Sequence, residues 1–220
     1  MWLRPAALGG MQVLIKPTDW SQTVIFDEVF LEKNYDLESL DIAPDLILDC
    51  GAHIGLFSLM ATAVYPKARI FAFEPNPNNV QFIRQQIAKN SLEIILIDSP
   101  VATEVSDRYF WQGNSHNSHL LEGENMEGIG YKVRTVDLPA MLRELNPGKL
   151  LLKLDVEGEE ESILPAIAPI FPRECVVYFE THAGQAGWDK ASSILTNCGF
   201  DVRQTNMRDK YADGIAIRRS

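Results

Sequence analysis

The sequence has few cysteines and no cysteine motif. Cys50, Cys175 and Cys198 are widely spaced, and none of them belongs to a CxxC pair. A cysteine-bound zinc site and a disulfide framework therefore lack support, and a reducing compartment is favoured. The first five residues, MWLRP, have no long apolar run behind a basic flank. We therefore predict no signal peptide and a cytoplasmic protein.

Long uninterrupted apolar runs are also missing. The most apolar stretch, residues 42–65, contains Asp45, Asp49 and His53. Placing an Asp at the centre of a bilayer costs roughly 2.5–3.5 kcal/mol. This stretch is therefore predicted to belong to a protein core, and no membrane span is expected.

Positive charge is scarce, with 20 Lys and Arg residues against 30 Asp and Glu residues and a formal net charge of −10. Nucleic-acid binding depends on clustered positive charge, so we expect no nucleic-acid partner. An acidic chain suits a neutral or cationic small ligand instead. The remaining composition, 46% hydrophobic and 23% charged over 220 residues, is typical of one globular domain.

What the sequence does contain is an alternation of short apolar runs with helix-like periods. We expect buried strands at 45–50, 68–73 and 92–97, with helices at 54–64 and 78–89 between them. Strands separated by helices of about ten to fifteen residues form right-handed crossovers in a parallel sheet.

The second half of the chain continues this pattern after an interruption. It is expected to contain a hairpin with a long loop at 109–130, strands at 131–134, 150–155, 175–180, 200–202 and 214–217, and helices at 136–145, 159–168 and 188–198. The whole predicts an α/β fold with a doubly wound, mostly parallel seven-stranded sheet and one reversed strand. Residues 1–44 are expected to form an N-terminal cap on the substrate side of a catalytic domain, residues 45–220.

A glycine turn joins the first expected strand to its helix, in the run DCGAHIG from Asp49 to Gly55. In a doubly wound sheet this strand end borders the ligand crevice. Gly51 and Gly55 allow a tight turn there, and the backbone at Ala52 can approach a ligand closely. A dinucleotide site would place glycine where the bulky His53 stands, so pyrophosphate is disfavoured. The carboxylate of Asp49 suits an ammonium group instead.

An acidic residue follows the second expected strand. Glu74 lies 19 residues after Gly55, where a carboxylate can accept hydrogen bonds from both ribose hydroxyls. Pro75 ends the strand beside it and is counted with the cofactor-binding residues. Together with an amine-facing Asp49, this arrangement predicts an adenosyl amino acid, S-adenosylmethionine, as the cofactor. The alternative is that Glu74 only caps the next helix.

These residues resemble the FkbM-type family of class I S-adenosylmethionine-dependent methyltransferases. The matching stretches are DCGAHIG at 49–55, FEPNP at 73–77, KLDVEG at 153–158 and FETH at 179–182. The resemblance extends over about residues 10–217 and implies methylation of a hydroxyl oxygen, often on sugars or polyketide-like natural products. His53 is a departure, because family members often carry Asn there.

Four acid or base groups follow the fourth and fifth main strands, namely Asp155, Glu157, Glu180 and His182. Methyl transfer to a hydroxyl needs close positioning of the acceptor and a base for its proton. We therefore predict these four as the catalytic groups, with Asp155 also beside the cofactor. Glu157 could instead cap the next helix. Lys153, inside an apolar strand, could have a purely structural ion pair.

A divalent cation is a further possibility at these strand ends. Asp155 and Glu180 could supply carboxylates to Mg²⁺. No Asp-Asn pair follows the fifth strand, however, and the run from Glu180 to His182 departs from that pattern. Mg²⁺ is therefore possible but not favoured, and no metal ligand is predicted.

The remaining candidate residues are expected to contact adenine or the acceptor. The adenine ring is predicted to pack on Ser99, Val101 and Ala102 after the third strand. The acceptor is predicted to contact Tyr35, His116, Asn117, Ser118 and His182.

The sequence thus predicts an S-adenosylmethionine-dependent O-methyltransferase acting on a hydroxyl of a small molecule, such as a sugar or a natural-product alcohol or phenol. Two alternatives remain. An NAD(P)-linked reductase is disfavoured by the missing third glycine. A non-catalytic adenosyl-binding partner subunit could share the fold, and an oligomer is possible.

Overall fold

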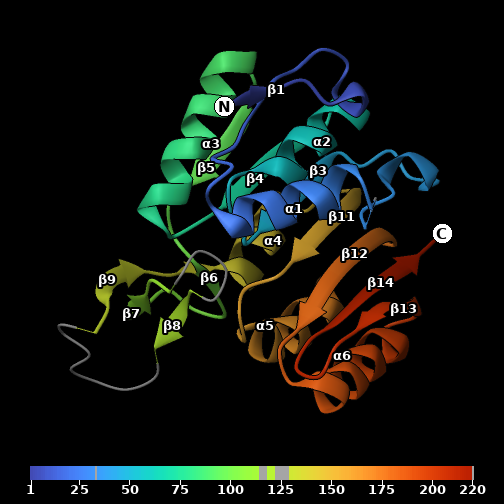
Figure 1. The fold of residues 1–220 in the computed structure, drawn as a ribbon. Helices are drawn as coiled ribbons and strands as arrows, with labels where there is room; N and C mark the ends of the chain where they lie inside the picture. Colours follow the sequence, from blue (N-terminus) through green and yellow to red (C-terminus); the bar gives the residue numbers. More distant parts are fainter. Residues whose placement is uncertain (33, 114–117, 122–128, 220) are drawn as a thin grey trace.

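The central sheet of the protein confirms the doubly wound architecture. The computed structural model describes residues 1–32, 34–113, 118–121 and 129–219. Within them, seven strands form one sheet in the order β13-β14-β12-β11-β3-β4-β5 (Figure 1). The strands are β3 (Leu46–Cys50), β4 (Arg69–Phe73), β5 (Ile94–Ile97), β11 (Lys149–Leu154), β12 (Glu174–Thr181), β13 (Asp201–Met207) and β14 (Ala212–Arg218). Only β14 runs against its neighbours, so the predicted single reversed strand is confirmed.

Helices cover both surfaces of this sheet, and the alternation of side chains along the strands explains why. Leu150, Leu152 and Leu154 of β11 belong to one hydrophobic core, whereas Leu151 belongs to the other. Side chains alternate across a strand, so a buried strand must be apolar on both surfaces. The helices are α1 (Trp20–Phe30), α2 (Leu56–Val64), α3 (Pro77–Asn90), α4 (Leu138–Leu145), α5 (Glu160–Ile167) and α6 (Gly184–Asn197). The first three pack on the side of Leu151 and the last three on the other.

The N-terminal segment is part of this hydrophobic core. Its strands β1 (Trp2–Leu3) and β2 (Val13–Leu14) pair with each other, and α1 packs beside α2. Val13 and Val29 are buried in the same cluster as the residues of α2. The segment is therefore continuous with one layer of the fold, and α1 borders the large cavity described below.

A small antiparallel sheet interrupts the main alternation. It has the order β8-β7-β9, with β7 (Asp107–Trp111), β8 (His119–Leu121) and β9 (Tyr131–Arg134), and Figure 1 shows it projecting to the side of the main sheet. The predicted hairpin and the strand at 131–134 are confirmed. The predicted helix at 136–145 begins only at Leu138, because β10 (Val136–Asp137) pairs with β6 (Val101–Ala102).

No helix among the described residues has both the length and the apolar character needed to cross a bilayer.

The turn after β3 depends on Gly51. Its φ is +84°, and an added Cβ would lie 1.8 Å from the carbonyl oxygen of Asp155. Gly10 also has a positive φ, +102°, but open space around the added atom. The close approach of the β3 and β11 ends therefore requires glycine at position 51 for space as well as for backbone conformation.

We expect Gly51→Ala to lower the free energy of unfolding by about 3 kcal/mol or more, against about 1 kcal/mol for Gly10→Ala, because only the first adds a clash to the backbone strain. Urea denaturation of both variants measures this difference. Equal losses would contradict the steric argument.

Candidate active site

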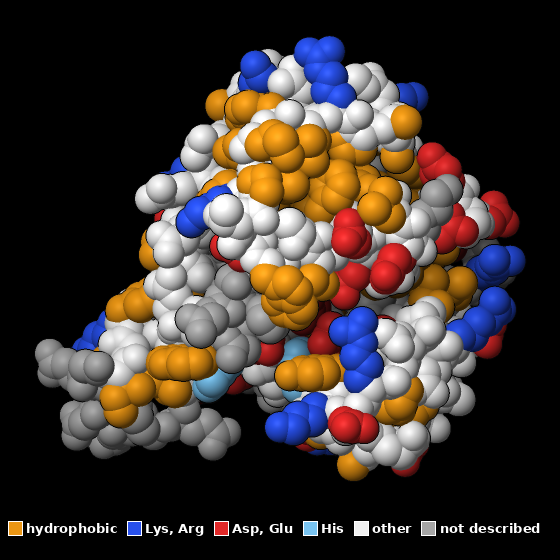
Figure 2. Space-filling view, viewed as in Figure 1, with side chains coloured by type: hydrophobic (Ala, Val, Ile, Leu, Met, Phe, Trp, Pro, Cys, Tyr) orange, Lys and Arg blue, Asp and Glu red, His pale blue; other side chains and the backbone are white. Residues whose placement is uncertain are grey.

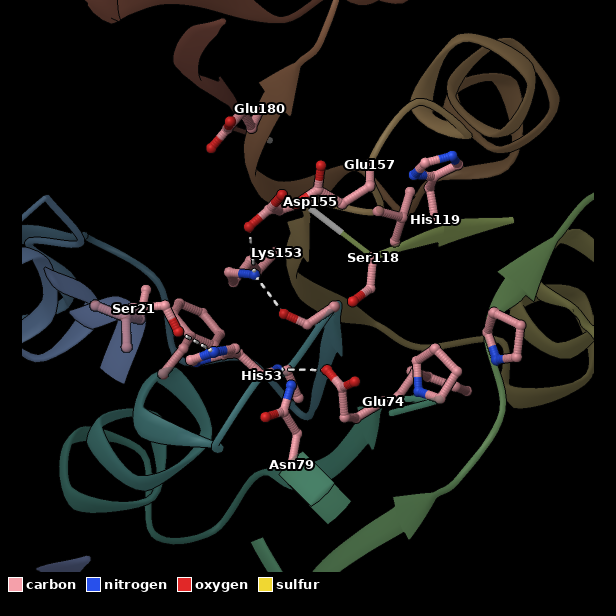
Figure 3. Close-up of a pocket in the computed structure, with 18 of the residues that line it drawn as sticks. Ser21, His53, Glu74, Asn79, Ser118, His119, Lys153, Asp155, Glu157 and Glu180 are labelled. Atoms are coloured by element: carbon pink, nitrogen blue, oxygen red, sulfur yellow. Dashed lines mark hydrogen bonds and ion pairs between the residues drawn. The ribbon is translucent and has the colours of Figure 1, made fainter. Parts of the chain in front are cut away.

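A cavity of about 330 Å³ lies at the carboxyl ends of β3, β4 and β11 (Figure 3). This volume is at the lower end of the range for small-molecule sites. The predicted cofactor residues that line it are Gly51, Ala52, His53, Glu74, Pro75, Val101 and Asp155. Asp49, Gly55, Ser99 and Ala102 are not among its lining residues. Figure 2 shows acidic side chains gathered at a hollow in the surface.

The side chain of Glu74 is held at the inner end of this cavity. Its two carboxylate oxygens accept hydrogen bonds from the backbone N–H of His53 at 2.7 Å and of Asn76 at 2.8 Å. Burial raises the pKa of Glu74 to about 7. The N-cap of α3 is the side chain of Asn76, which accepts from the N–H of Asn78. Glu74 also has a hydrogen bond with the side chain of Asn79, and it lines the cavity although it is not the N-cap residue of α3.

Asp49 differs from its predicted position. Its side chain has no exposed surface, and Oδ2 accepts a hydrogen bond of 2.6 Å from the hydroxyl of Ser58. Oδ1 points to Lys153, whose Nζ is 3.9 Å away. Burial raises the pKa of Asp49, while Lys153 and Ser58 oppose the rise. A direct contact between Asp49 and a ligand amine does not fit this geometry, because the carboxylate lies beneath the lining of the cavity.

Lys153 links the two sides of the site. Its Nζ donates to the carbonyl oxygen of Gly51 at 2.8 Å and to Oδ2 of Asp155 at 3.2 Å. Burial works to lower the pKa of Lys153, but the charges of Asp155 and Asp49 oppose it and the pKa is raised. Lys153 is therefore a fixed cation in the wall of the cavity.

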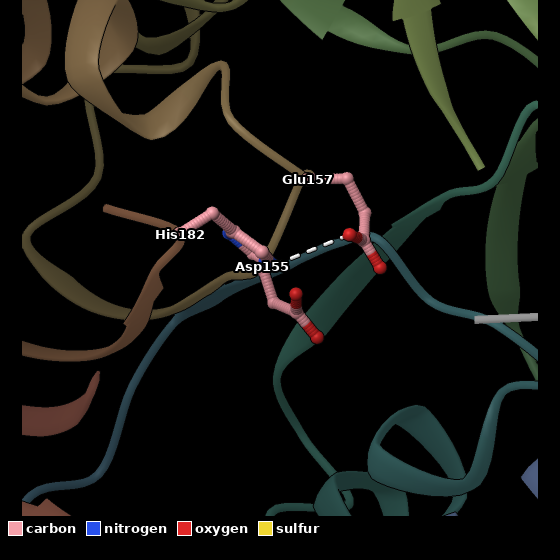
Figure 4. A group of neighbouring side chains, drawn as sticks. All are labelled: Asp155, Glu157 and His182. Carbon is pink, nitrogen blue, oxygen red and sulfur yellow. Dashed lines mark ion pairs between the residues drawn. The ribbon is translucent and has the colours of Figure 1, made fainter. Parts of the chain in front are cut away.

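The predicted catalytic groups come together around His182. Its Nε2 lies 3.3 Å from Oε2 of Glu157 and 3.4 Å from Oε1 of Glu180, and Figure 4 shows it beside Asp155 and Glu157. Its Nδ1 lies 3.3 Å from Glu160. Burial works to lower the pKa of His182, but the hydrogen bonds to Glu157 and Glu160 raise it to about 11. This raised pKa favours the imidazolium form of His182 at neutral pH, so the base predicted there would first have to give up a proton.

The pKa of Glu180 is raised as well. Its carboxyl group shares a hydrogen bond with Asp213, a residue that the sequence did not single out. Burial, together with the charges of Asp155 and Asp213, raises the pKa of Glu180. Asp155 faces the cation Lys153 and lines the cavity. It is the best placed of the four groups to accept a proton.

Glu160 is a structural residue of this site that the sequence did not identify. It is 2% exposed, and its carboxylate accepts hydrogen bonds from the backbone N–H of Val156 at 2.6 Å and of Gly158 at 2.9 Å. These bonds hold the loop before α5, and the N-cap residue Glu159 makes no side-chain capping bond, so the capping considered for Glu157 is not made. The run EGEEE offers four carboxylates in five positions, and the backbone at Glu157 is left-handed, with φ 55°.

A second cavity of about 280 Å³ shares a wall with the first. Lys153, Asp155 and Glu180 line both, and the predicted acceptor residue Tyr35 lines only the second. The ring of Tyr35 packs edge-on against Tyr178, with ring centres 5.2 Å apart. The shared wall therefore includes two of the four predicted catalytic groups, Asp155 and Glu180.

The predicted acceptor loop is described only in part. His116 and Asn117 lie outside the described residues. Ser118 lines the first cavity. Further lining residues that the sequence did not single out for the site are Ser21, Asn79, Arg208 and Tyr211, and Pro100 lines the cavity beside the predicted adenine contact Val101. The hydroxyl oxygen of Ser21 lies 3.1 Å from Nε2 of His53. Helix α1 therefore contributes directly to the cavity wall.

Comparison with known proteins identifies the family of the chain. The family model described as the methyltransferase FkbM domain matches residues 49–202. The chain belongs to the FkbM methyltransferase family. It is 42% identical to methyltransferase sdnD of Sordaria araneosa, over 81% of this chain and 82% of that one. It is 25% identical to the 31-O-demethyl-FK506 methyltransferase FkbM of Streptomyces tacrolimicus, over 81% of each chain.

Solved structures confirm the fold of this FkbM-family protein. Methyltransferase FkbM from Methylobacillus flagellatus KT matches with a TM-score of 0.59 and 13% identity, covering 83% of this chain and 46% of that one. Precorrin-6y C5,15-methyltransferase from Geobacter metallireducens GS-15 matches with a TM-score of 0.54 and 18% identity, covering 86% and 89%. The protein is thus a methyltransferase with the class I, Rossmann-like fold.

One group in this FkbM-family site has the spacing of metal ligands. Within the described part of the chain, Asp155, Glu157 and His182 can bring one ligand atom each within 4.8 Å of one another. Both ring nitrogens of His182 already face carboxylates, however, and an imidazolium has no lone pair to offer a metal. Mg²⁺ in turn prefers oxygen ligands. In the present arrangement these residues form an ion-paired cluster around His182, and no metal role is assigned to them.

The charge of His182 gives a pH dependence of stability. The pKa of His182 is raised in the folded protein to about 11 from an ordinary value of 6.5, so the proton stabilises the fold fully below about pH 6.5. That contribution is lost as the pH rises toward 11. We expect the stability advantage of the wild type over His182→Asn to shrink by about 1 kcal/mol per pH unit across this window. Urea denaturation at several pH values measures it, and a constant difference would contradict the imidazolium assignment.

Proposed function

We propose that this chain is an S-adenosylmethionine-dependent methyltransferase that methylates a hydroxyl oxygen of a small molecule. The observation that carries the proposal is the first cavity, which has the buried carboxylate of Glu74 at one end and Asp155 at the other. Between them lies the glycine turn after β3.

The residues at the Glu74 end fit an adenosyl group. Glu74 would accept hydrogen bonds from the two ribose hydroxyls, as an acidic residue does after the second strand of such sheets. Pro100 and Val101 would pack beside the adenine ring. A Cβ at Gly51 would clash with the backbone of Asp155, so the turn presents bare backbone to the cavity at this point.

The sulfonium of S-adenosylmethionine, when bound, supplies an activated methyl group. The chain's own residues have three tasks: to place the acceptor oxygen in line with that group, to exclude water, and to take up the hydroxyl proton. Asp155 would receive the proton, because it lines both cavities and Glu157 is already bound to His182. Lys153 would keep Asp155 turned toward the acceptor.

The second cavity would hold the acceptor. It shares Asp155 and Glu180 with the first cavity, so a hydroxyl placed there would meet the methyl group at the common wall. The name of the Streptomyces relative describes methylation of 31-O-demethyl-FK506. By analogy, we propose a natural-product hydroxyl as the acceptor of this chain.

Binding of the product S-adenosylhomocysteine tests the cofactor assignment. We expect its affinity to rise as the pH passes through about 7, because Glu74, with a pKa of about 7, then becomes the carboxylate that ribose hydroxyls require. Glu74→Gln should weaken binding about 10- to 100-fold at higher pH and remove this pH dependence. Isothermal titration calorimetry measures both effects.

Two controls make this experiment decisive. Glu93→Gln makes the same change at an exposed position beside β5 and should bind like the wild type. NADH should produce no binding heat. Binding of NADH without binding of S-adenosylhomocysteine would overturn the proposal in favour of a reductase. Adenosyl binding without methyl transfer to any acceptor in a labelled-donor screen would favour a non-catalytic subunit.

A further inference from the structure

A buried charge group connects β3 and β11 beneath the cavity. Asp49 and Lys153 are register partners on these neighbouring strands. Oδ1 of Asp49 is fully buried and has no hydrogen-bond partner among the described residues, while Nζ of Lys153 lies 3.9 Å from it. Nζ is closer to Asp155, at 3.2 Å, and Figure 3 shows it turned to that carboxylate. One cation thus stands between two carboxylates and is bonded to only one of them.

We infer that Lys153 and Asp49 are positioning residues for methyl transfer: Lys153 orients Asp155, and Asp49 balances the charge of Lys153 once Asp155 has taken up the acceptor proton. This inference rests on the proposed function and assigns Asp49 a role different from the amine contact expected from the sequence.

The charge balance of the step explains why a second carboxylate is needed. The acceptor oxygen forms a bond to the methyl carbon as the carbon–sulfur bond breaks, and the electron pair of that bond stays on sulfur. The hydroxyl proton goes to Asp155, which becomes neutral. Lys153 would then be a buried cation without a partner, an expensive state inside a protein. Asp49 removes this cost, because its free oxygen already faces Nζ.

Asp49 is suited to this role by its fixed and inaccessible position. The hydroxyl of Ser58 holds Oδ2 at 2.6 Å, so the carboxylate cannot turn toward the cavity. The negative charge of Asp155 is one of the causes that raise the pKa of Asp49. Neutralising Asp155 therefore favours the ionised form of Asp49, at the moment when Lys153 needs it. Tyr35, the other group that acts on Lys153, is an uncharged phenol with a raised pKa.

The first experiment separates positioning from cofactor binding by replacing Asp49 with Asn. We expect kcat for methyl transfer to fall about tenfold or more, while the Kd for S-adenosylhomocysteine stays within about threefold of the wild type. Asp45→Asn is the matched control, because Asp45 bridges β3 and β11 at their far end by accepting from Gly148 and Lys149. It should leave both values unchanged.

Two outcomes of this experiment would overturn the inference. A Kd weakened more than about tenfold with an unchanged kcat would show that Asp49 contacts the cofactor. Unchanged values of both would show that Asp49 has no part in the reaction.

The second experiment measures the charge coupling without any turnover. Lys153→Met leaves Asp49 buried without a cation and should lower the urea midpoint. Adding Asp49→Asn removes that isolated charge, so the double variant should regain about half of the loss. Lys149→Met in the same strand, whose Nζ pairs with Glu174 at 2.6 Å near the surface, should have little effect. Additive losses in the double variant would overturn the proposed pairing.

These experiments distinguish the inference from the function on which it rests. A wild-type chain that binds no S-adenosylhomocysteine contradicts the proposed function, whatever the urea midpoints show. A wild-type chain that binds it and transfers methyl groups, combined with either overturning result above, contradicts only the roles of Lys153 and Asp49.

Discussion

The buried ammonium of Lys153 is the constraint on which the site is built. A lysine that is 3% exposed inside a strand of leucines is stable only with counter-charges and acceptors close at hand. The fold supplies them from two strands: the carbonyl of Gly51 and the carboxylate of Asp49 at the end of β3, and Asp155 just beyond β11. Satisfying one cation therefore fixes the glycine turn, the two carboxylates and the mouth of the cavity relative to one another.

A second cationic side chain, that of His182, is surrounded by acidic residues in the same way. His182, with its raised pKa, stands among carboxylates from three segments, the loop after β11, the start of α5 and the end of β12. Glu160 closes the loop by accepting from its backbone, which frees Glu157 to reach His182. The site thus contains two internal cations, Lys153 and His182, that hold its carboxylates in place. This explains how a chain of net charge −10 can gather so many acids at one point.

The sequence predicts the frame of this site better than its charges. Alternation of apolar runs with helical periods identified the seven main strands, and spacing from Gly55 placed Glu74 at the cavity. The strand predictions rest on the periodicity of apolar residues and the Glu74 prediction on a sequence spacing, and both can be read from the sequence directly. The burial of Asp49 depends instead on which neighbour lies across the next strand, and the charge of His182 on three residues that only the fold brings together. Such pairings follow from register and side-chain direction, for which one sequence contains no signal.

The two cavities are lined in part by different elements of the fold. The glycine turn follows β3, Glu74 follows β4, and Val101 begins the short strand β6 after β5, so the proposed cofactor end lies at the ends of the first three strands of the main sheet. The second cavity is lined by residues outside those loops, among them Tyr35 and, in the turn between β13 and β14, Arg208 and Tyr211. Under the proposed function, a change at Tyr35 would alter the acceptor cavity and leave the lining of the cofactor cavity unchanged, whereas Lys153 and Asp155 line both cavities. On the proposed function, the cofactor end and Asp155 would supply the methyl-transfer chemistry, and the residues that line only the second cavity would select the acceptor.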